Sequence, residues 1–213
     1  MDLRNKNVLI TAGPTIEKID DVRFISNFST GKMGYALAQA AEQEAANVFL
    51  ISGPVSIPKP NNVKVFEVES AQEMFDQVHS LKEDMDLFIM SAAVSDYRPK
   101  NKHSGKIKKE YFGDNLTIEL EKNPDILKSI GENKRDNQFL VGFALESQDP
   151  INNAKRKLIN KNCDLIILNT ANTKDSGFGG DYNTVKLLFK NGNIIDLPTM
   201  KKSDLAFEII EHF

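Results

Sequence analysis

The stretch Val8-Leu9-Ile10-Thr11-Ala12-Gly13-Pro14-Thr15 opens the chain with an apolar run that ends in a glycine-proline turn. A helical pattern over residues 31–45 follows, and Val48-Phe49-Leu50-Ile51 is a second apolar run of the same kind. This order predicts a strand, a helix and a parallel strand. Runs that are apolar throughout are typical of strands covered on both faces. The opening therefore predicts an α/β fold.

The same alternation continues along the chain. Strands are expected at residues 63–68, 87–90, 139–141 and 165–168, and helices at about 71–83, 125–133 and 150–160. Near the C-terminus, residues 185–189 and 194–197 flank Asn191-Gly192, a pair typical of a hairpin turn. We expect a Rossmann-like, three-layer fold, in which helices flank a mostly parallel sheet with an antiparallel edge.

Composition limits the classes of function. In 213 residues, 27 Lys and Arg stand against 30 Asp and Glu, so the formal charge of −3 gives no general attraction to nucleic acid or anionic membranes. The apolar runs are far shorter than the roughly 20 residues of a membrane span. Cys163 is the single cysteine, and the N-terminus has no signal-peptide core. We expect one domain, residues 1–213, in the cytoplasm, with neither nucleic acid nor a membrane as partner.

Between residues 95 and 121 the rhythm of strands and helices fails. The segment is rich in cations and ends in the alternating Leu116-Thr117-Ile118-Glu119-Leu120; its basic residues are Lys100, Lys102, His103, Lys106, Lys108 and Lys109. An excursion of this length is more often a functional lid or an interface than a passive connection. We expect it to supply an active-site lid and a surface for dimerisation.

Two nucleotide-binding motifs are absent where the fold would place them. A dinucleotide site needs a Gly-x-Gly-x-x-Gly turn after the first strand, and only Gly13 is present. The segment Ser26-Asn27-Phe28-Ser29-Thr30-Gly31-Lys32-Met33-Gly34 is only superficially like a P-loop. Ser26 replaces its first glycine, and Met33 replaces the magnesium-binding hydroxyl. We expect no NAD cofactor.

The same segment offers an anion site of another kind. Ser29 and Thr30 are favourable N-caps, and the free backbone N–H groups of a helix start can bind phosphate or carboxylate. Ser29, Thr30, Gly31 and Lys32 are therefore candidate phosphate-binding residues. A capped helix with no ligand explains the segment equally well.

Seven short strings occur in the order found in the bacterial phosphopantothenoylcysteine synthetase family, which the chain resembles from about Lys6 to its end. They are Gly13-Pro14-Thr15, the 26–34 segment, Ser52-Gly53-Pro54-Val55, Ala92-Ala93-Val94-Ser95-Asp96-Tyr97-Arg98, Lys106-Ile107-Lys108-Lys109, Lys122-Asn123-Pro124-Asp125-Ile126 and Val141-Gly142-Phe143. Each string is weak alone, but the ordered set is specific. In many bacteria this module follows a flavin-dependent decarboxylase. We expect the free-standing form here, with a separate decarboxylase as a candidate partner.

The resemblance implies a ligase of coenzyme A biosynthesis. Family members activate the carboxylate of 4′-phosphopantothenate with CTP, release pyrophosphate, and pass the acyl-cytidylate to the amine of cysteine, which releases CMP. The resemblance also implies a homodimer and Mg²⁺ carried by the triphosphate, with unknown protein ligands and no flavin. Eukaryotic relatives use ATP, and the choice between CTP and ATP does not follow from the sequence.

Two catalytic residues follow from the resemblance. Asn27 matches the family's key asparagine, whose amide can donate and accept hydrogen bonds but cannot act as a base near neutral pH. Its expected role is to orient the acyl group. Lys106 matches the first lysine of a Lys-x-Lys-Lys motif on a loop that closes over the nucleotide. A cap for Asn27 and a solvated loop for Lys106 are the structural alternatives.

The resemblance also implies a set of nucleotide contacts. They are Gly13, Ser91, Ala92, Asp96, Lys106, Pro124, Asp125, Ile126, Leu127, Phe143, Lys157 and Lys161. Local patterns agree in part, because Pro124 and Asp125 are typical of a helix start, and Lys157 and Lys161 share one helical face.

Three other functions stay open on the residues alone. A Rossmann-fold oxidoreductase is disfavoured by the missing glycine turn. A non-catalytic nucleotide-binding module would tolerate loss of Asn27 and Lys106. A nucleic-acid binder would use the basic residues of 100–109, but the acidic remainder and the lack of interleaved aromatics disfavour it.

Overall fold

The computed structural model describes residues 1–108, 110, 115–169 and 179–213. Its centre is an eight-stranded sheet in the order β12-β11-β10-β9-β6-β1-β4-β5. The strands are β1 Asn7–Ala12, β4 Asn47–Ser52, β5 Lys64–Glu67, β6 Leu87–Met90, β9 Phe139–Leu145, β10 Leu165–Asn169, β11 Tyr182–Phe189 and β12 Ile194–Lys201. The strands from β5 to β10 run parallel, whereas β11 and β12 pair antiparallel at one edge. The predicted fold class is confirmed.

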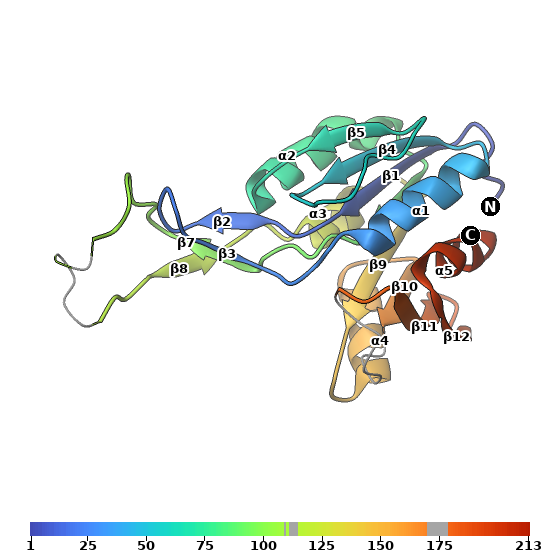
Figure 1. The fold of residues 1–213 in the computed structure, drawn as a ribbon. Coiled ribbons are helices and arrows are strands. Elements are labelled where there is room, and N and C mark those ends of the chain that lie inside the picture. Colours follow the sequence, from blue (N-terminus) through green and yellow to red (C-terminus); the bar gives the residue numbers. More distant parts are fainter. Residues whose placement is uncertain (109, 111–114, 170–178) are drawn as a thin grey trace.

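Helices cover both faces of the sheet (Figure 1). On one face lie α1 Lys32–Gln43 and α5 Lys202–Glu211. On the other lie α2 Ala71–Leu81, which continues into the 3-10 turn η1 Lys82–Asp84, and then α3 Ile126–Asn133 and α4 Pro150–Asn160. The three layers follow from strands that are apolar on both faces.

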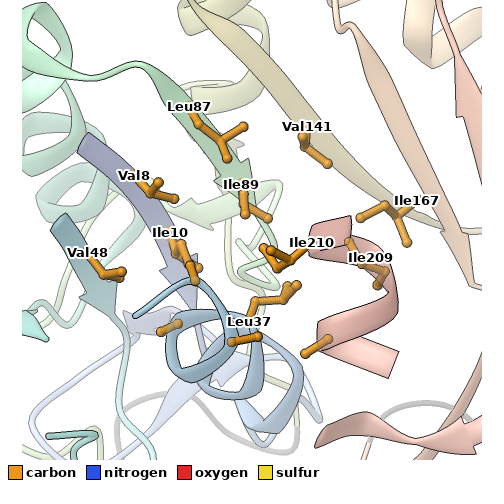
Figure 2. Packing of buried hydrophobic residues seen from close by; sticks show 14 of the residues in the cluster. Val8, Ile10, Leu37, Val48, Leu87, Ile89, Val141, Ile167, Ile209 and Ile210 are labelled. Carbon is orange, nitrogen blue, oxygen red and sulfur yellow. The ribbon is translucent and has the colours of Figure 1, made fainter. Parts of the chain in front are cut away.

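Alternate residues of the central strands point to opposite faces of the sheet and pack into two separate core clusters. Figure 2 shows Val8 and Ile10 of β1 on the same side as Leu37 of α1 and as Ile209 and Ile210 of α5. The intervening Leu9 belongs to the opposite cluster, with the buried residues of α2, α3 and α4. Each fully buried aliphatic side chain contributes about 1.5–3 kcal/mol, so both faces hold the sheet in place.

The short strands β2 Ile16–Lys18, β3 Phe24–Ser26 and β7 Tyr97–Pro99 were not expected from the sequence. Together with β8 Leu120–Lys122 and the segment that follows β6, they form a projecting arm. The hairpin of β2 and β3 lies beside the pair of β7 and β8. Figure 1 shows this arm projecting from the sheet beyond the carboxyl ends of the parallel strands.

Several local predictions are wrong. The strand expected over residues 116–120 lies instead at Leu120–Lys122, because those are the residues that pair with the three-residue strand β7. Helix α5 was not expected at all. Pro124 lies before the N-cap of α3, which is Asp125, and so it is not in the first turn. Lys109 lies outside the described residues.

Cys163 is fully buried, as expected for a packing role. Burial raises the pKa of its thiol to about 12, so the thiolate is disfavoured near neutral pH. Within the described ranges, no helix is both long and apolar enough to cross a membrane.

Candidate functional site

Two pockets lie at the carboxyl ends of the parallel strands. There β1 has β4 on one side and β6 on the other, so the chain changes direction across the sheet between β1 and β6. Ligands of open α/β sheets bind at such a point. We call the two hollows the strand-end pocket and the helix-start pocket.

The strand-end pocket has a volume of about 470 Å³. Its wall combines the ends of β1, β6 and β9 with the start of α3 and one face of α4; its residues are Thr11, Met90, Ala92, Val94, Ser95, Asp96, Tyr97, Lys122, Asn123, Pro124, Asp125, Ile126, Leu127, Phe143, Lys157 and Lys161. The structure therefore brings together most of the nucleotide contacts that the resemblance implied. Gly13, Ser91 and Lys106 are not part of this wall.

The helix-start pocket is smaller, about 140 Å³, and lies where α1 begins. Ser29, Thr30, Gly31 and Lys32 all line it, together with Ser91. Its remaining walls come from the ends of β6, β9 and β10 and the starts of β11 and α5; they include Ala92, Phe143, Asn169, Asn183 and Lys202. Ala92 and Phe143 line both pockets, so the two hollows adjoin at these residues.

The start of α1 differs from the expected capped helix. Gly31 is the N-cap, with a φ of 77°, and no side chain of the described residues caps the first turn. Ser29 instead accepts a hydrogen bond from the Gly31 N–H at 3.3 Å. The prediction that Ser29 and Thr30 act as caps is wrong. The first-turn N–H groups of a helix can bind an anion, and the helix start lines this pocket.

Glycines allow the loops around β1 to approach closely. Gly13 has a φ of 76°, and a Cβ there would lie 2.9 Å from Val55 Cγ1. A Cβ on Gly53 would lie 1.7 Å from the carbonyl oxygen of Pro14. The Gly-Pro-Thr and Ser-Gly-Pro-Val strings therefore pack against each other. Gly13 allows this close packing, although it lines neither pocket.

Backbone bonds then fix the segment that follows β6. The Ala93 N–H donates to Gly13 O at 2.9 Å, and the Ser95 N–H donates to Thr15 Oγ1 at 3.0 Å. Ala92 N–H also donates to Thr11 Oγ1 at 3.2 Å. This segment forms the wall between the pockets, and it is held by the loop after β1.

Asn27 lies next to that wall. Its side chain is exposed, and its Nδ2 donates to the carbonyl oxygen of Ala93 at 2.9 Å. This bond fixes the orientation of the amide and directs its donor toward the backbone of the helix-start pocket. The neighbouring Phe28 is 94% exposed.

Charged side chains of α3 and α4 surround the strand-end pocket. Asp125 caps α3 by accepting from the Lys128 N–H at 2.9 Å, and its other oxygen is hydrogen-bonded to Lys161. Burial alone would raise the pKa of Asp125, but the bonds from Lys161 and Lys128 outweigh it and hold the pKa below the ordinary value. Lys157 donates to Phe143 O at 2.6 Å, and burial lowers its pKa.

Lys106 is separate from both pockets in this structure. It lies on the arm, its side chain is exposed, and it lines neither hollow. Lys32 does line the helix-start pocket, and its ammonium is paired with Asp181 at 2.6 Å. The hydrogen bond from Lys32 holds the pKa of Asp181 below its ordinary value.

Buried polar atoms mark both pockets. Over the described ranges, four buried side-chain atoms have no hydrogen-bond partner: Ser95 Oγ, Asn123 Oδ1, Asn169 Oδ1 and Asn183 Oδ1. Each belongs to a residue that lines one of the two pockets. An unmade bond at a buried group costs about 1–3 kcal/mol, so such groups are rare outside ligand sites.

Sequence reasoning missed these four residues as site members. Asn123 lies in the string Lys122-Asn123-Pro124-Asp125-Ile126, and Asn169 directly follows the apolar run 165–168. Their positions in the sequence therefore indicated that both could belong to the site. Asn183 lies on β11, part of the hairpin, and reaches the pocket only because β11 pairs with β10. No local pattern marks it.

Comparison with known proteins agrees with this geometry. The family model described as "DFP: DNA/pantothenate metabolism flavoprotein C-terminal domain" matches residues 3–213. The chain is 49% identical over 210 residues to the "Coenzyme A biosynthesis bifunctional protein CoaBC" of Bacillus subtilis (strain 168), a match that covers 98% of this chain and 51% of that protein. The chain thus spans about half the length of the curated relatives it matches.

Solved structures give the same fold. The C-terminal domain of a coenzyme A biosynthesis bifunctional protein CoaBC is 42% identical, has a TM-score of 0.84, and the match covers 99% of this chain and 95% of that one. A Cab2 mutant in complex with phosphopantothenate-cysteine is 19% identical with a TM-score of 0.78, over 98% of this chain and 86% of that one. The second likeness concerns the fold alone. The resemblance drawn from the seven strings is confirmed.

Proposed function

Because the chain belongs to the family of DNA/pantothenate metabolism flavoprotein C-terminal domains, we propose that it is the ligase that joins 4′-phosphopantothenate to cysteine in coenzyme A biosynthesis. The observation that carries the proposal is the pair of adjoining pockets, whose walls hold the four buried side-chain atoms without a hydrogen-bond partner found among the described residues. A ligase that activates an acid with a nucleotide needs two ligands side by side. One pocket would hold each.

The strand-end pocket suits the nucleotide. Its wall is mostly neutral near β6 and β9, where Ala92 and Phe143 would lie beside the base, and it is cationic along α4. Lys157 and Lys161 would offset phosphate charge there. CTP is the nucleotide that the family resemblance favours.

The helix-start pocket suits the phosphate and acyl chain of phosphopantothenate. The first turn of α1 offers backbone donors, and Lys32 and the buried Lys202, which both line the pocket, would add positive charge. The acid would then reach toward Ala92, where the two pockets adjoin. Asn27, whose Nδ2 donates to Ala93 O beside that junction, would orient the acyl oxygen.

The reaction proceeds in two displacements. A carboxylate oxygen of phosphopantothenate attacks the α-phosphorus of CTP, and pyrophosphate leaves. The amine of cysteine then attacks the acyl carbon of the cytidylate, and CMP leaves with the bonding electrons and a proton is lost from nitrogen. Fixed donors and cations that lower the energy of the developing charges are what the protein must supply.

Mg²⁺ would enter with the triphosphate. Among residues with a described position, no group of three or more His, Cys, Asp or Glu side chains is placed to hold a metal ion. Magnesium usually takes one or two carboxylates together with substrate phosphates. Asp96, which is exposed at the strand-end pocket, fits such a role, whereas Asp125 is held by Lys161. When bound, the cation would offset charge on the phosphates.

A direct assay tests the proposal. We expect pyrophosphate and phosphopantothenoylcysteine to form when the purified protein is incubated with 4′-phosphopantothenate, cysteine, Mg²⁺ and CTP, and to form more slowly with ATP. Pyrophosphate release and product mass would be followed for each nucleoside triphosphate. Orthophosphate as the product would point to an acyl-phosphate ligase. If the protein bound CTP but formed no product, it would be a non-catalytic nucleotide-binding module.

We also propose that the arm forms a homodimer. The part of the arm that the structure describes exposes six large apolar side chains: Val22, Phe24, Phe28, Tyr97, Leu116 and Leu120. Apolar side chains gathered on one projecting element are typical of a protein interface. The short pairs β2-β3 and β7-β8 could present these side chains to a second copy.

Phe24→Glu should therefore weaken dimerisation, because it would place a charge in an apolar interface. Light scattering coupled to gel filtration would show a shift from dimer toward monomer as the protein is diluted. Ile159→Glu is the matched control, since Ile159 is 75% exposed on α4, away from the arm. A dimer of unchanged affinity in Phe24→Glu would place the interface elsewhere.

A further inference from the structure

A buried carboxylate on the arm holds the backbone next to Lys106. Asp20 lies in the turn between β2 and β3, and its side chain is fully buried although the arm projects from the main core (Figure 1). Its Oδ1 accepts the N–H groups of Val22 and Arg23 at 2.8 and 2.7 Å. Its Oδ2 accepts from the Arg23 guanidinium and, at 3.0 Å, from the N–H of Ile107.

Arg23 completes the attachment. Its Nη2 donates to the carbonyl oxygen of Ile107 at 2.9 Å, so both backbone groups of Ile107 are bonded to the Asp20-Arg23 pair. The Arg23 guanidinium and the three backbone donors hold the pKa of the Asp20 carboxyl far below its ordinary value. The carboxylate therefore keeps its charge and its acceptors across the working pH range.

The residue on the other side of Lys106 is held as well. The Gly105 N–H donates to Asp21 Oδ2 at 2.8 Å, and the His103 N–H donates to Ile19 O at 3.0 Å. Lys106 itself points its side chain into solvent, between two neighbours whose backbones are fixed. The lysine thus lies on a segment whose backbone is hydrogen-bonded on both sides of it.

The same hairpin ends at Asn27. Strand β3 leads from the Asp20 turn to Ser26, whose Oγ donates to Thr15 O at 2.7 Å, and Asn27 follows directly. The proposed catalytic asparagine and lysine are thus joined through one short hairpin. Asp20 attaches the lysine segment to this hairpin together with Arg23 and Asp21.

We propose that Asp20 is a positioning residue, which fixes the segment 105–107 to the β2-β3 hairpin so that Lys106 and Asn27 are held by one rigid unit. The catalytic consequence rests on the proposed ligase function. Misplacement of a catalytic group by about 1 Å can cost up to about 10²-fold in rate. Asp20 acts through Lys106 and needs no contact with the substrate.

Asp20→Asn tests the proposal with little change of shape. Whichever way the amide turns, its NH₂ faces N–H groups that the carboxylate had accepted, and the ion pair with Arg23 is lost. We expect amide hydrogen exchange of peptides covering residues 103–108, and tryptic cleavage after Lys106, to become severalfold faster. The melting temperature should stay near that of the unmodified protein, because the arm lies outside the main core. Glu119→Gln, which breaks an exposed ion pair with Lys100 on the same arm, is the control and should change neither readout.

Kinetics complete the test. Asp20→Asn should lower kcat between about tenfold and 10²-fold with a smaller change in the KM for phosphopantothenate. In a Lys106→Gln background the same change should lower kcat by less than about twofold, because the residue it positions is gone. Equal losses in both backgrounds would overturn the proposal, and so would unchanged exchange and cleavage. If the unmodified protein shows no ligase turnover, the proposed function and the catalytic part fail together, while the exchange result still decides whether Asp20 holds the segment.

Discussion

Asn27→Asp is expected to stop the reaction after its first half. The change is nearly isosteric, but it replaces the Nδ2 that donates to Ala93 O at 2.9 Å with an oxygen, which that carbonyl repels. At working pH it also adds a negative charge beside the phosphates. Activation of the acid can proceed without this donor, whereas attack by cysteine requires an oriented acyl group. We therefore expect the variant to form phosphopantothenoyl-cytidylate and pyrophosphate in a single turnover, with little phosphopantothenoylcysteine.

Quenched-reaction mass spectrometry would detect the cytidylate at the stoichiometry of the enzyme. Asn133→Asp is a matched control, because Asn133 also donates from Nδ2 to a backbone carbonyl, that of Ser129, at 2.8 Å, and it lines neither pocket. Final product at the normal rate from Asn27→Asp would leave Asn27 as a structural residue. Failure to form even the cytidylate would assign its role to the activation step.

Lys106→Gln is expected to lower kcat/KM by roughly 10²–10³, which corresponds to about 2.7–4 kcal/mol for one lost donor to developing charge. The fold should be unaffected, since the side chain is exposed on the arm and is not part of either core cluster. Steady-state kinetics with CTP, together with circular dichroism, would separate a catalytic loss from a loss of structure.

Lys102→Gln is the control for this second change. Lys102 lies on the same arm, with its ammonium 3.9 Å from an Asp21 carboxylate oxygen, and both side chains are about half exposed. Such exposed pairs contribute about 0–1 kcal/mol, so little change is expected. A near-normal kcat/KM in Lys106→Gln would show that Lys106 is an ordinary solvated lysine. Asp20 could then still hold residues 105–107, but it would not position a catalytic residue.

The central sheet could be predicted because its strands are apolar on both faces. The run Leu87-Phe88-Ile89-Met90 became β6 with the expected bounds, and α4 begins and ends at the predicted residues. Helix α5 was missed although Leu205, Ala206, Ile209 and Ile210 are spaced for one buried face. It starts directly after β12, so no turn residue separates the two elements.

The arm could not be predicted from local pattern. Strands β2, β3 and β7 have three residues each, which is too short for a strand pattern to show, and the β2-β3 hairpin packs beside β7, which is far from it in the sequence. Ile107 gives no sign of its attachment to Asp20, since 87 residues separate the two. Long-range contacts of this kind depend on the assembled sheet.

The candidate site was predicted mainly through the family resemblance. Residues at strand ends, such as Ala92 and Phe143, had a physical reason to meet, because parallel strands end at one edge. The cap of α1 was assigned wrongly because Gly31 adopts a left-handed conformation that moves the helix start past both hydroxyl residues. Which pocket each residue lines depends on how the loops after β1 and β6 bond to each other.

Both ends of the chain lie at the amino edge of the sheet, opposite the pockets. The ring of Phe213 packs against Phe139, the first residue of β9, with ring centroids 6.1 Å apart. The Asn7 N–H, at the start of β1, donates to the Asp86 carboxylate just before β6. Since β6 lies between β1 and β9, these two anchor points are separated by two strand spacings, roughly 10 Å. A short glycine-serine linker could therefore close the chain into a ring. A circular permutant reopened at the exposed Asn191-Gly192 turn, on the same edge, should keep the whole carboxyl edge and its two pockets intact.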